Sequence, residues 1–186
     1  MDASPQTSTP RGASTREPFV RSLDDLARLT TRELADIYSR GTVPDSLAVL
    51  DGDLVGRLLA VRGLDRGSPF RALASFARSA AFPWGGKSFR SKDGGHGTGI
   101  NRLRLGKSGG RHRLFPFATR LGASVIDERP CVVLDYDDPD NPPVIRAIHD
   151  EVREVAPRLF LGPACVKRKS GTPATVLWFG LYVRAN

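Results

Sequence analysis

Three side chains capable of acid–base chemistry lie within fifteen positions of one another in the sequence: Asp135, Tyr136 and His149. Histidine titrates near neutral pH, and a positioned carboxylate or phenol beside it can exchange a proton with a substrate. If a sheet encloses a pocket next to these residues, His149 with Asp135 or Tyr136 could act as acid and base in a small isomerase, cyclase or hydrolase. A histidine at the edge of an apolar surface is also commonly packed and hydrogen-bonded without a catalytic role. The sequence leaves both interpretations open.

A second set of residues is suited to binding an apolar molecule. Aromatic side chains form the wall of such a site, and basic side chains at its mouth orient a charged group. The predicted ligand is therefore a lipid-like or other apolar small molecule with an anionic end. The candidate wall residues are Trp84, Phe115, Phe117, Trp178 and Phe179, and the candidate anion contacts are Lys87, Arg102 and Arg104.

Most of the net charge comes from one glycine-rich segment, residues 87–113. The chain has a formal net charge of +8, and this segment holds eight basic residues against one acid, Asp93. Such a stretch is typical of a solvated loop or of one that meets an anion, and phosphate contacts would be of the right sign. A binding site for single-stranded nucleic acid is expected to contain aromatic side chains that stack on the bases, and Phe89 is the only aromatic residue inside the segment. Nucleic-acid binding is therefore a third hypothesis, after ligand binding and a cavity enzyme.

Motifs for nucleotide and metal binding are incomplete. Residues 85–88 and 106–108 end like a phosphate-binding loop, but both lack the first glycine, five positions before the second. The three histidines do not have the spacing of a metal site. The acidic run 135–140 fits a turn whose side chains bond to local backbone N–H groups better than it fits a Ca²⁺ loop. The sequence predicts neither a metal nor a cofactor.

The order of elements predicts a mainly β fold. Closely spaced strands with short turns favour an antiparallel, lipocalin-like (calycin-type) barrel or curved sheet with flanking helices. Residues 83–89 are expected to turn the chain back, and residues 168–173 to form the turn of a hairpin. The predicted strands cover residues 52–62, 101–105, 113–117, 123–127, 131–134, 159–167 and 174–183.

Helices are expected beside the strands. Residues 30–33 match a capping box within the helical region 22–40, and Ser68 with Pro69 begins a helix over 70–81. A third helix is predicted over 144–156, with Asn141 as its cap, from apolar residues that recur at helical spacing. Residues 1–21 have the composition of a disordered tail, so residues 22–186 are expected to form one β-barrel-like domain with an N-terminal helix.

The composition indicates a folded protein of a reducing compartment. Hydrophobic residues make up 40% of the chain, which is enough for a core. No apolar run is long enough to span a membrane, and the polar N-terminus lacks a signal core, which predicts a cytoplasmic protein. Cys131 and Cys165 are expected to be buried free thiols, because each lies in an apolar, strand-like run.

Two short motifs, Gly-Asp-Leu-Val-Gly at residues 52–56 and Trp-Gly-Gly-Lys-Ser-Phe at residues 84–89, resemble those of the bacterial GXWXG family. Residues 52–56, Gly-Asp-Leu-Val-Gly, have the Gly-x-Trp-x-Gly spacing, with Leu54 at the position of the tryptophan. Residues 84–89, Trp-Gly-Gly-Lys-Ser-Phe, match the Trp-x-Gly-Lys-x-Phe element of that family.

The later part of the chain is similar to the domain of unknown function that usually follows this family. The similarity lies in Tyr136-Asp137 with the prolines after it, in Gly162 and in the aromatic final strand. The whole resemblance covers roughly residues 41–183 and leaves residues 90–130 unmatched. It implies a small lipocalin-like barrel and implies no activity.

Overall fold

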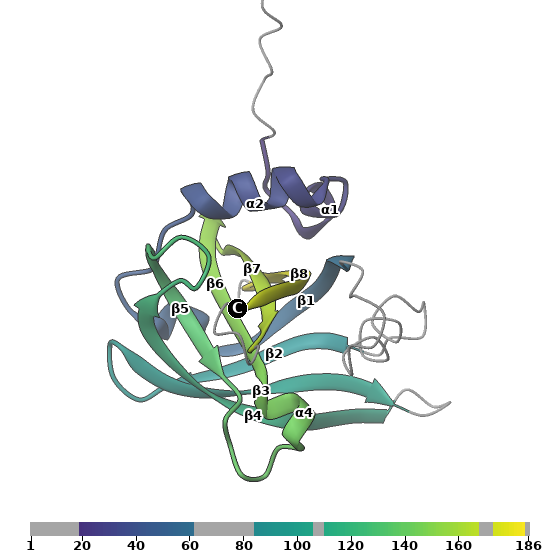
Figure 1. The fold of residues 1–186 in the computed structure, drawn as a ribbon, viewed down its shortest axis with the longest axis vertical. Helices are drawn as coiled ribbons and strands as arrows, with labels where there is room; N and C mark the ends of the chain where they lie inside the picture. Colours follow the sequence, from purple (N-terminus) through teal and green to yellow (C-terminus); the bar gives the residue numbers. More distant parts are fainter. Residues whose placement is uncertain (1–18, 62–83, 106–109, 168–172, 185–186) are drawn as a thin grey trace, which may run out of the picture.

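The computed structural model is a closed antiparallel barrel in which each strand pairs with the next along the chain (Figure 1). The structure describes residues 19–61, 84–105, 110–167 and 173–184. Pairing of the first strand with the last closes the barrel, so the predicted antiparallel barrel is confirmed. The strands are β1 (Gly52–Val61), β2 (Trp84–Ser91), β3 (His96–Leu105), β4 (Gly110–Ala123), β5 (Pro130–Asp135), β6 (Ile148–Ala156), β7 (Leu159–Val166) and β8 (Ala174–Tyr182).

Two helices flank the barrel, as the sequence predicts. Helices α1 (Leu23–Ala27) and α2 (Thr31–Arg40) lie across the outside of strands β6 to β8 and β1 (Figure 1). The expected capping box begins α2: the backbone N–H of Glu33 donates to Thr30 Oγ1 at 3.3 Å, and that of Thr30 donates to the Glu33 carboxylate at 2.7 Å. Two short helices, η1 (Leu47–Leu50) and α4 (Pro143–Arg146), contribute side chains to the barrel core.

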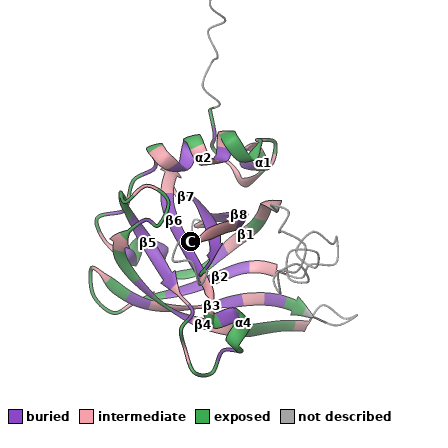
Figure 2. Cartoon of the chain, viewed as in Figure 1, coloured by how far each residue is buried: buried purple, intermediate pink, exposed green. Residues whose placement is uncertain are grey.

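The barrel wall separates two apolar cores. The inner core fills the barrel with side chains such as Leu54, Phe117 and Phe179. The outer core lies between the helices and strands β7 and β8, where the rings of Tyr38 and Trp178 meet edge to face at 5.6 Å. Figure 2 shows the resulting burial on both the strands and the inward side of α2. Strand β8 is therefore buried on both faces, which is possible because side chains on both of its faces are largely apolar.

The predicted helix over 144–156 is wrong. Helix α4 ends at Arg146, and β6 begins at Ile148. The apolar residues of this segment recur at helical spacing by coincidence. Ile148 and Val152 lie on the inner face of strand β6, and Asp150 lies between them on the same face. The outer face of β6 carries polar residues that other parts of the chain bury. The strand therefore lacks the alternation of apolar and polar residues that identifies a strand with one exposed face. Asn141 does not cap a helix; its side-chain amide donates to the carbonyls of Pro116 and Tyr136.

Two further predictions need correction, and three lie mainly outside the described residues. Residues 84–91 form strand β2 rather than a turn, and β4 ends at Ala123, so 124–127 belong to a turn. The acidic run 135–140 is a turn of the expected kind, in which Asp135 and Asp138 accept bonds from backbone N–H groups two residues on. The predicted tail, the helix over 70–81 and the hairpin turn at 168–173 fall largely in the undescribed segments, although β7 and β8 do pair as a hairpin requires.

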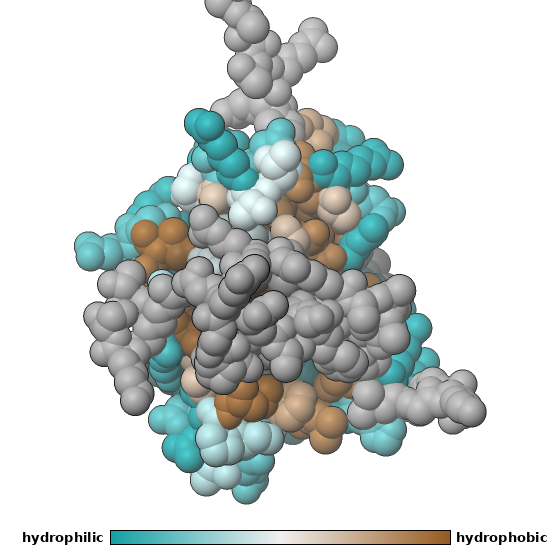
Figure 3. Space-filling model, turned by 45° about the vertical axis from the view of Figure 1, so that its right-hand side comes forward, coloured by the Kyte–Doolittle hydropathy of each residue, from teal (hydrophilic) through white to brown (hydrophobic). Residues whose placement is uncertain are grey.

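The outer surface mixes hydrophilic and hydrophobic residues. On the face drawn in Figure 3, hydrophilic residues follow much of the outline, and hydrophobic patches lie between them. No helix among the described residues is long and apolar enough to cross a membrane. Cys131 and Cys165 are both buried and free, as predicted, and burial raises the pKa of Cys165 to about 12.

Candidate binding site in the barrel interior

A cluster of five polar side chains lies inside the apolar barrel. Lys87 Nζ donates to Asp150 Oδ2 at 3.0 Å, to Asn101 Oδ1 at 2.9 Å and to the Tyr136 hydroxyl. The Tyr136 hydroxyl donates to Asp150 Oδ2 at 3.0 Å, and Trp84 Nε1 donates to Asn101 Oδ1 at 3.0 Å. We call these residues the inner cluster. It connects strands β2, β3 and β6 with the end of β5.

Aromatic rings surround the ammonium group of Lys87. Its Nζ lies 5.1 Å from the ring centres of Phe117 and Phe179, 5.2 Å from that of Tyr136 and 5.5 Å from that of Trp84. Only 2% of the Lys87 surface is exposed. The negative faces of such rings attract a cation, but this attraction only partly replaces the hydration that the buried cation has lost. Lys87 therefore depends on the inner cluster for its polar contacts.

The barrel register brings these residues together. Lys87 and Asn101 are direct partners across β2 and β3, and Leu54 faces Lys87 from β1. At Gly86, where φ is +123°, an added Cβ would lie 2.1 Å from the carbonyl oxygen of Leu54. At Gly56, an added Cβ would lie 2.6 Å from the Trp84 ring. The two glycines thus allow β1 and β2 to approach so closely that the Trp84 ring packs on the β1 backbone.

Burial sets the protonation behaviour of the cluster. Loss of hydration lowers the pKa of Lys87, and the carboxylate of Asp150 opposes that shift. Burial also raises the pKa of Tyr136 well above its usual range, and the charge of Asp150 adds to this effect. At neutral pH Tyr136 is therefore a hydrogen-bond donor, while the charged form of Lys87 depends on Asp150.

One oxygen of the cluster has no hydrogen-bond partner in the described part of the chain. Asp150 is 4% exposed, and its Oδ1 is buried without a hydrogen-bond partner among the described residues, whereas Oδ2 accepts from both Lys87 and Tyr136. An unpaired buried carboxylate oxygen costs free energy, so such groups commonly mark a function or an absent donor. The inner cluster can thus accept one more hydrogen bond.

The structure brings together half of the residues proposed to bind a ligand. Trp84, Lys87, Phe117 and Phe179 meet in the barrel interior, and Phe115 packs at the edge of the same core. The other three lie elsewhere. Trp178 faces outward under α2, whereas Arg102 and Arg104 lie on the outer face of β3, where Arg102 bonds to Asp53.

The proposed acid–base residues are divided between the two faces of the wall. Asp135 and His149 are direct partners across β5 and β6, on the outer face. Asp135 accepts from Lys167 Nζ at 3.4 Å, while His149 Nε2 lies 3.9 Å from the Glu151 carboxylate and has no hydrogen bond among the described residues. Tyr136 points into the barrel instead. His149 and Asp135 are therefore adjacent, but they do not share a site with Tyr136.

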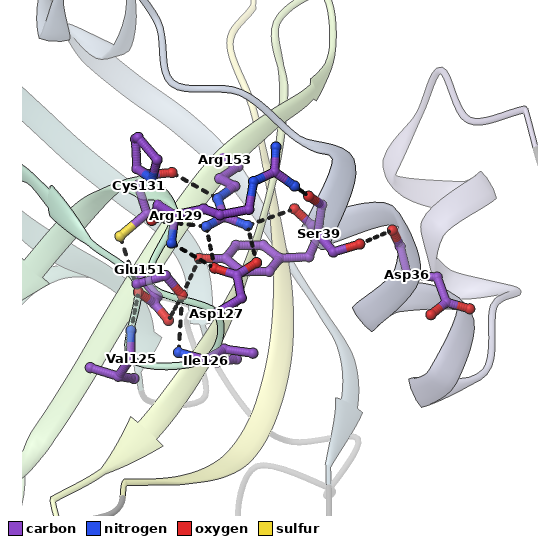
Figure 4. A network of polar contacts seen from close by, with 12 residues as sticks. Asp36, Ser39, Val125, Ile126, Asp127, Arg129, Cys131, Glu151 and Arg153 are labelled. Carbon is purple, nitrogen blue, oxygen red and sulfur yellow. Dashed lines mark hydrogen bonds and ion pairs between the residues drawn. The ribbon is translucent and has the colours of Figure 1, made fainter.

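A second polar network lies outside the barrel, beneath α2 (Figure 4). Arg153, with no exposed surface, forms two bonds of 2.6 and 2.8 Å to the Asp127 carboxylate and donates to the carbonyl of Tyr38 at 3.2 Å. Glu151 accepts from Ser124 Oγ at 2.9 Å and belongs to the same region. These contacts join α2 and the 124–129 turn to β6, so the network stabilises the fold.

Sequence reasoning missed two members of the inner cluster, Asn101 and Asp150. Asp150 lies in the segment that is predicted as a helix, and Asn101 is only the first residue of a predicted strand. The available signal was the alternation of Ile148, Asp150 and Val152, which puts Asp150 on the inner row if the segment is a strand. Among the described residues, no group of three or more His, Cys, Asp or Glu side chains is arranged to hold a metal ion.

Comparison with known proteins yields a fold likeness alone. No protein-family model matches the sequence, and no curated protein does. A crystal structure of a protein from Thermomonospora curvata is similar, with a TM-score of 0.53 and 17% identity over 84% of this chain and 89% of that chain. At this identity the likeness shows that the two chains share a fold.

Proposed function

We propose that the barrel binds an apolar small molecule whose polar end meets the inner cluster. The observation that carries the proposal is the charged pair of Lys87 and Asp150 in an otherwise apolar interior. Burying two charges costs several kcal/mol each, and apolar residues of similar size commonly fill such positions with equal or greater stability. The interior of an eight-stranded barrel is just wide enough to be filled by side chains or to hold one small ligand. A polar group retained there is therefore suited to recognition of a ligand.

The pairing also favours a neutral polar end. Asp150 already neutralises Lys87, so a carboxylate placed beside Lys87 would meet the carboxylate of Asp150. A hydroxyl or amide N–H of the ligand would instead supply the hydrogen bond that Asp150 Oδ1 does not receive from any described residue. The anionic end expected from the basic residues of the sequence is thus replaced, in our proposal, by an uncharged hydrogen-bonding end.

Two tryptophans allow a sharp test. Trp84 belongs to the inner cluster, whereas Trp178 packs outside the wall against Tyr38. In a Trp178→Phe variant, straight-chain alcohols of increasing length should change the emission of Trp84, with affinity rising with chain length because more apolar surface is buried. The matched Trp84→Phe variant keeps only Trp178 and should not respond. Emission of Trp84 that is indifferent to every alcohol in the series would refute the proposal.

Native mass spectrometry offers an independent check of the same proposal. Protein purified under mild conditions should carry a co-purified small molecule, which leaves on denaturation. Substitution of Asp150 by Asn should change the retained molecule or release it, because the amide presents a donor as well as an acceptor.

A second candidate function is binding of nucleic acid to the outer face of β3 and β4. Arg102 faces Arg113 and Arg104 faces Arg111 across these strands, and residues two apart share a face. Like charges placed opposite one another are destabilising, and Asp53 is the acidic partner seen for Arg102 and Arg113. This arginine ladder offers a concentrated positive face for phosphates.

The salt dependence of binding tests this candidate. Affinity for a single-stranded oligonucleotide should fall steeply with salt, since phosphate contacts release counterions. Arg104→Glu with Arg111→Glu should abolish binding, whereas Arg28→Glu with Arg32→Glu changes the net charge equally on the distant helices and should retain most of it. An equal loss of affinity in the two double variants would indicate that the overall positive charge attracts the oligonucleotide and that the arginine ladder is not a specific site.

A further inference from the structure

The ammonium group of Lys87 combines two features that favour amine chemistry, burial in an apolar site and contact with a carboxylate. Its Nζ is buried among four aromatic rings and contacts a carboxylate at 3.0 Å. A lysine that loses its hydration in an apolar site becomes a better nucleophile, because burial favours its neutral amine over the ammonium. The described lysines Lys92 and Lys167 are exposed and lack these conditions.

We propose that Lys87 forms a Schiff base with the carbonyl carbon of an apolar aldehyde bound in the barrel. The inference rests on the proposed function, because the same inner cluster receives the polar end of the ligand. An aldehyde gains a hydroxyl that can donate to Asp150 Oδ1 only after Lys87 has added to its carbonyl carbon. It assigns Lys87 as the nucleophile, Asp150 as the group that takes and returns the proton, and Tyr136 as a hydrogen-bond donor.

The proton transfers follow the contacts of the cluster. Lys87 first passes one proton from Nζ to Asp150 Oδ2, 3.0 Å away, and becomes a neutral amine. The nitrogen lone pair then attacks the carbonyl carbon, and the second proton of the nitrogen moves to the former carbonyl oxygen, giving a carbinolamine. The protonated Asp150 returns its proton to this hydroxyl, which leaves as water while a C=N bond forms. The products are a protonated imine, water and the original carboxylate.

The remaining contacts suit the intermediate. Asp150 Oδ1, which has no partner among the described residues, can accept a hydrogen bond from the carbinolamine hydroxyl. The Tyr136 hydroxyl donates to Asp150 Oδ2 at 3.0 Å and keeps its proton at neutral pH, since burial raises its pKa. Asp150 thus holds the leaving oxygen on one side and the reactive nitrogen on the other.

Reductive trapping tests the proposal on the unmodified protein. Incubation with decanal and cyanoborohydride at neutral pH converts an imine into a stable secondary amine, which peptide mass spectrometry locates. Label should accumulate at Lys87 ahead of the exposed Lys92 and Lys167, which serve as internal controls. Label that reaches Lys92 and Lys167 but leaves Lys87 unmodified overturns the proposal.

Variants of Lys87 and Asp150 test the two roles, nucleophile and proton carrier, separately. Lys87→Arg keeps a cation beside Asp150 but cannot form an imine, so label at this position should disappear. Asp150→Asn should slow labelling of Lys87 by about 10²-fold, the range typical of a lost general acid–base. Asp150→Glu restores a carboxylate and should recover part of the rate, which a merely structural role would not predict. Equal labelling rates of Lys87 in the wild type and in Asp150→Asn would remove Asp150 from the mechanism.

A final comparison distinguishes this inference from the function on which it rests. Decanol lacks a carbonyl, so its binding, read from Trp84 emission, depends on the site alone. If decanol binds and decanal leaves Lys87 unlabelled, the Schiff base is refuted and ligand binding stands. If decanol fails to bind and decanal leaves no label on Lys87, both proposals fall.

Discussion

Asp150 and Glu151 are adjacent residues of β6, yet they serve separate polar networks on opposite faces of the barrel wall. Asp150 bonds to Lys87 and Tyr136 inside, whereas Glu151 accepts from Ser124 and from the Cys131 thiol outside. Both carboxylates are almost fully buried. Substitutions at these neighbouring positions should therefore have different consequences, one for the ligand and one for the attachment of the 124–129 turn.

The first prediction concerns the buried ion pair. Lys87→Met should lower the free energy of unfolding by about 3 to 5 kcal/mol, because it leaves the charge of Asp150 uncompensated. Lys87→Met with Asp150→Leu removes both charges and should recover most of this loss. Urea denaturation of both single variants and the double variant gives the coupling energy. Strict additivity of the two single losses would show that the groups do not act as a pair.

The second prediction concerns the close approach of β1 and β2. Gly86→Ala should destabilise the protein by about 2 to 5 kcal/mol, since it combines a strained φ with a Cβ placed 2.1 Å from the Leu54 carbonyl. Gly52 also has positive φ, +102°, but an added Cβ has nothing within 4 Å. Gly52→Ala should therefore cost about 1 to 3 kcal/mol, from backbone strain alone. Equal losses in the two variants would show that contact between the strands is unimportant.

The third prediction concerns stability in alkali. Burial raises the pKa of Tyr38, and the charge of Glu151 raises it further, so the folded protein keeps a proton that the unfolded chain loses near pH 10. The unfolded state then binds fewer protons, and the contribution of Tyr38 to stability, complete below pH 10, declines as the pH rises above it. Tyr38→Phe should flatten this decline by up to about 1.4 kcal/mol per pH unit.

Denaturation midpoints between about pH 9 and pH 11, compared in wild type and Tyr38→Phe, measure this effect. The two proteins should differ by a constant amount below pH 9, since the phenol is then protonated in both states. Parallel curves across the whole range would show that Tyr38 ionises equally in the folded and unfolded chains.

The fourth prediction concerns the attachment of the helices. Trp178→Ala should cost about 3 to 5 kcal/mol, because the side chain is 3% exposed and packs against the Tyr38 ring. Val49 offers a control: it is apolar but 46% exposed, so Val49→Ala should change stability by less than about 0.5 kcal/mol. A Trp178→Ala protein with an unchanged thermal midpoint would mean that the outer core contributes nothing.

The barrel could be predicted from the sequence because its strands carry strong local signals. Alternating apolar rows and short turns identify β7 and β8, and a complete capping box identifies α2. The aromatic wall residues Trp84, Phe117 and Phe179, together with Lys87, could be selected by residue type. The segment of Trp84 and Lys87 is predicted as a turn and forms strand β2 instead. Their meeting in one interior follows from barrel closure, which no local pattern encodes.

The parts that escaped prediction are those where tertiary contacts override local pattern. Arginine is usually a surface residue, but Arg153 is buried because Asp127 and backbone carbonyls accept the hydrogen bonds of its guanidinium group. Asp150 is hidden for a similar reason, since Lys87 lies far from it in sequence and supplies its partner only after the barrel forms. A strand with charged residues on both faces resembles an amphipathic helix until those partners are known.

The pairing of β1 with β8 has a consequence for synthesis on the ribosome. β1 emerges early, but its partner Ala174–Tyr182 is the last strand in the described part of the chain. Until that strand emerges, β1 and β7 each present an open edge, and apolar side chains of both cores stay exposed to other nascent chains. Pairing over such a sequence distance is slow, because loop closure precedes the stabilising contacts. Expression at lower temperature or with chaperones that shield open edges should therefore raise the yield of folded protein.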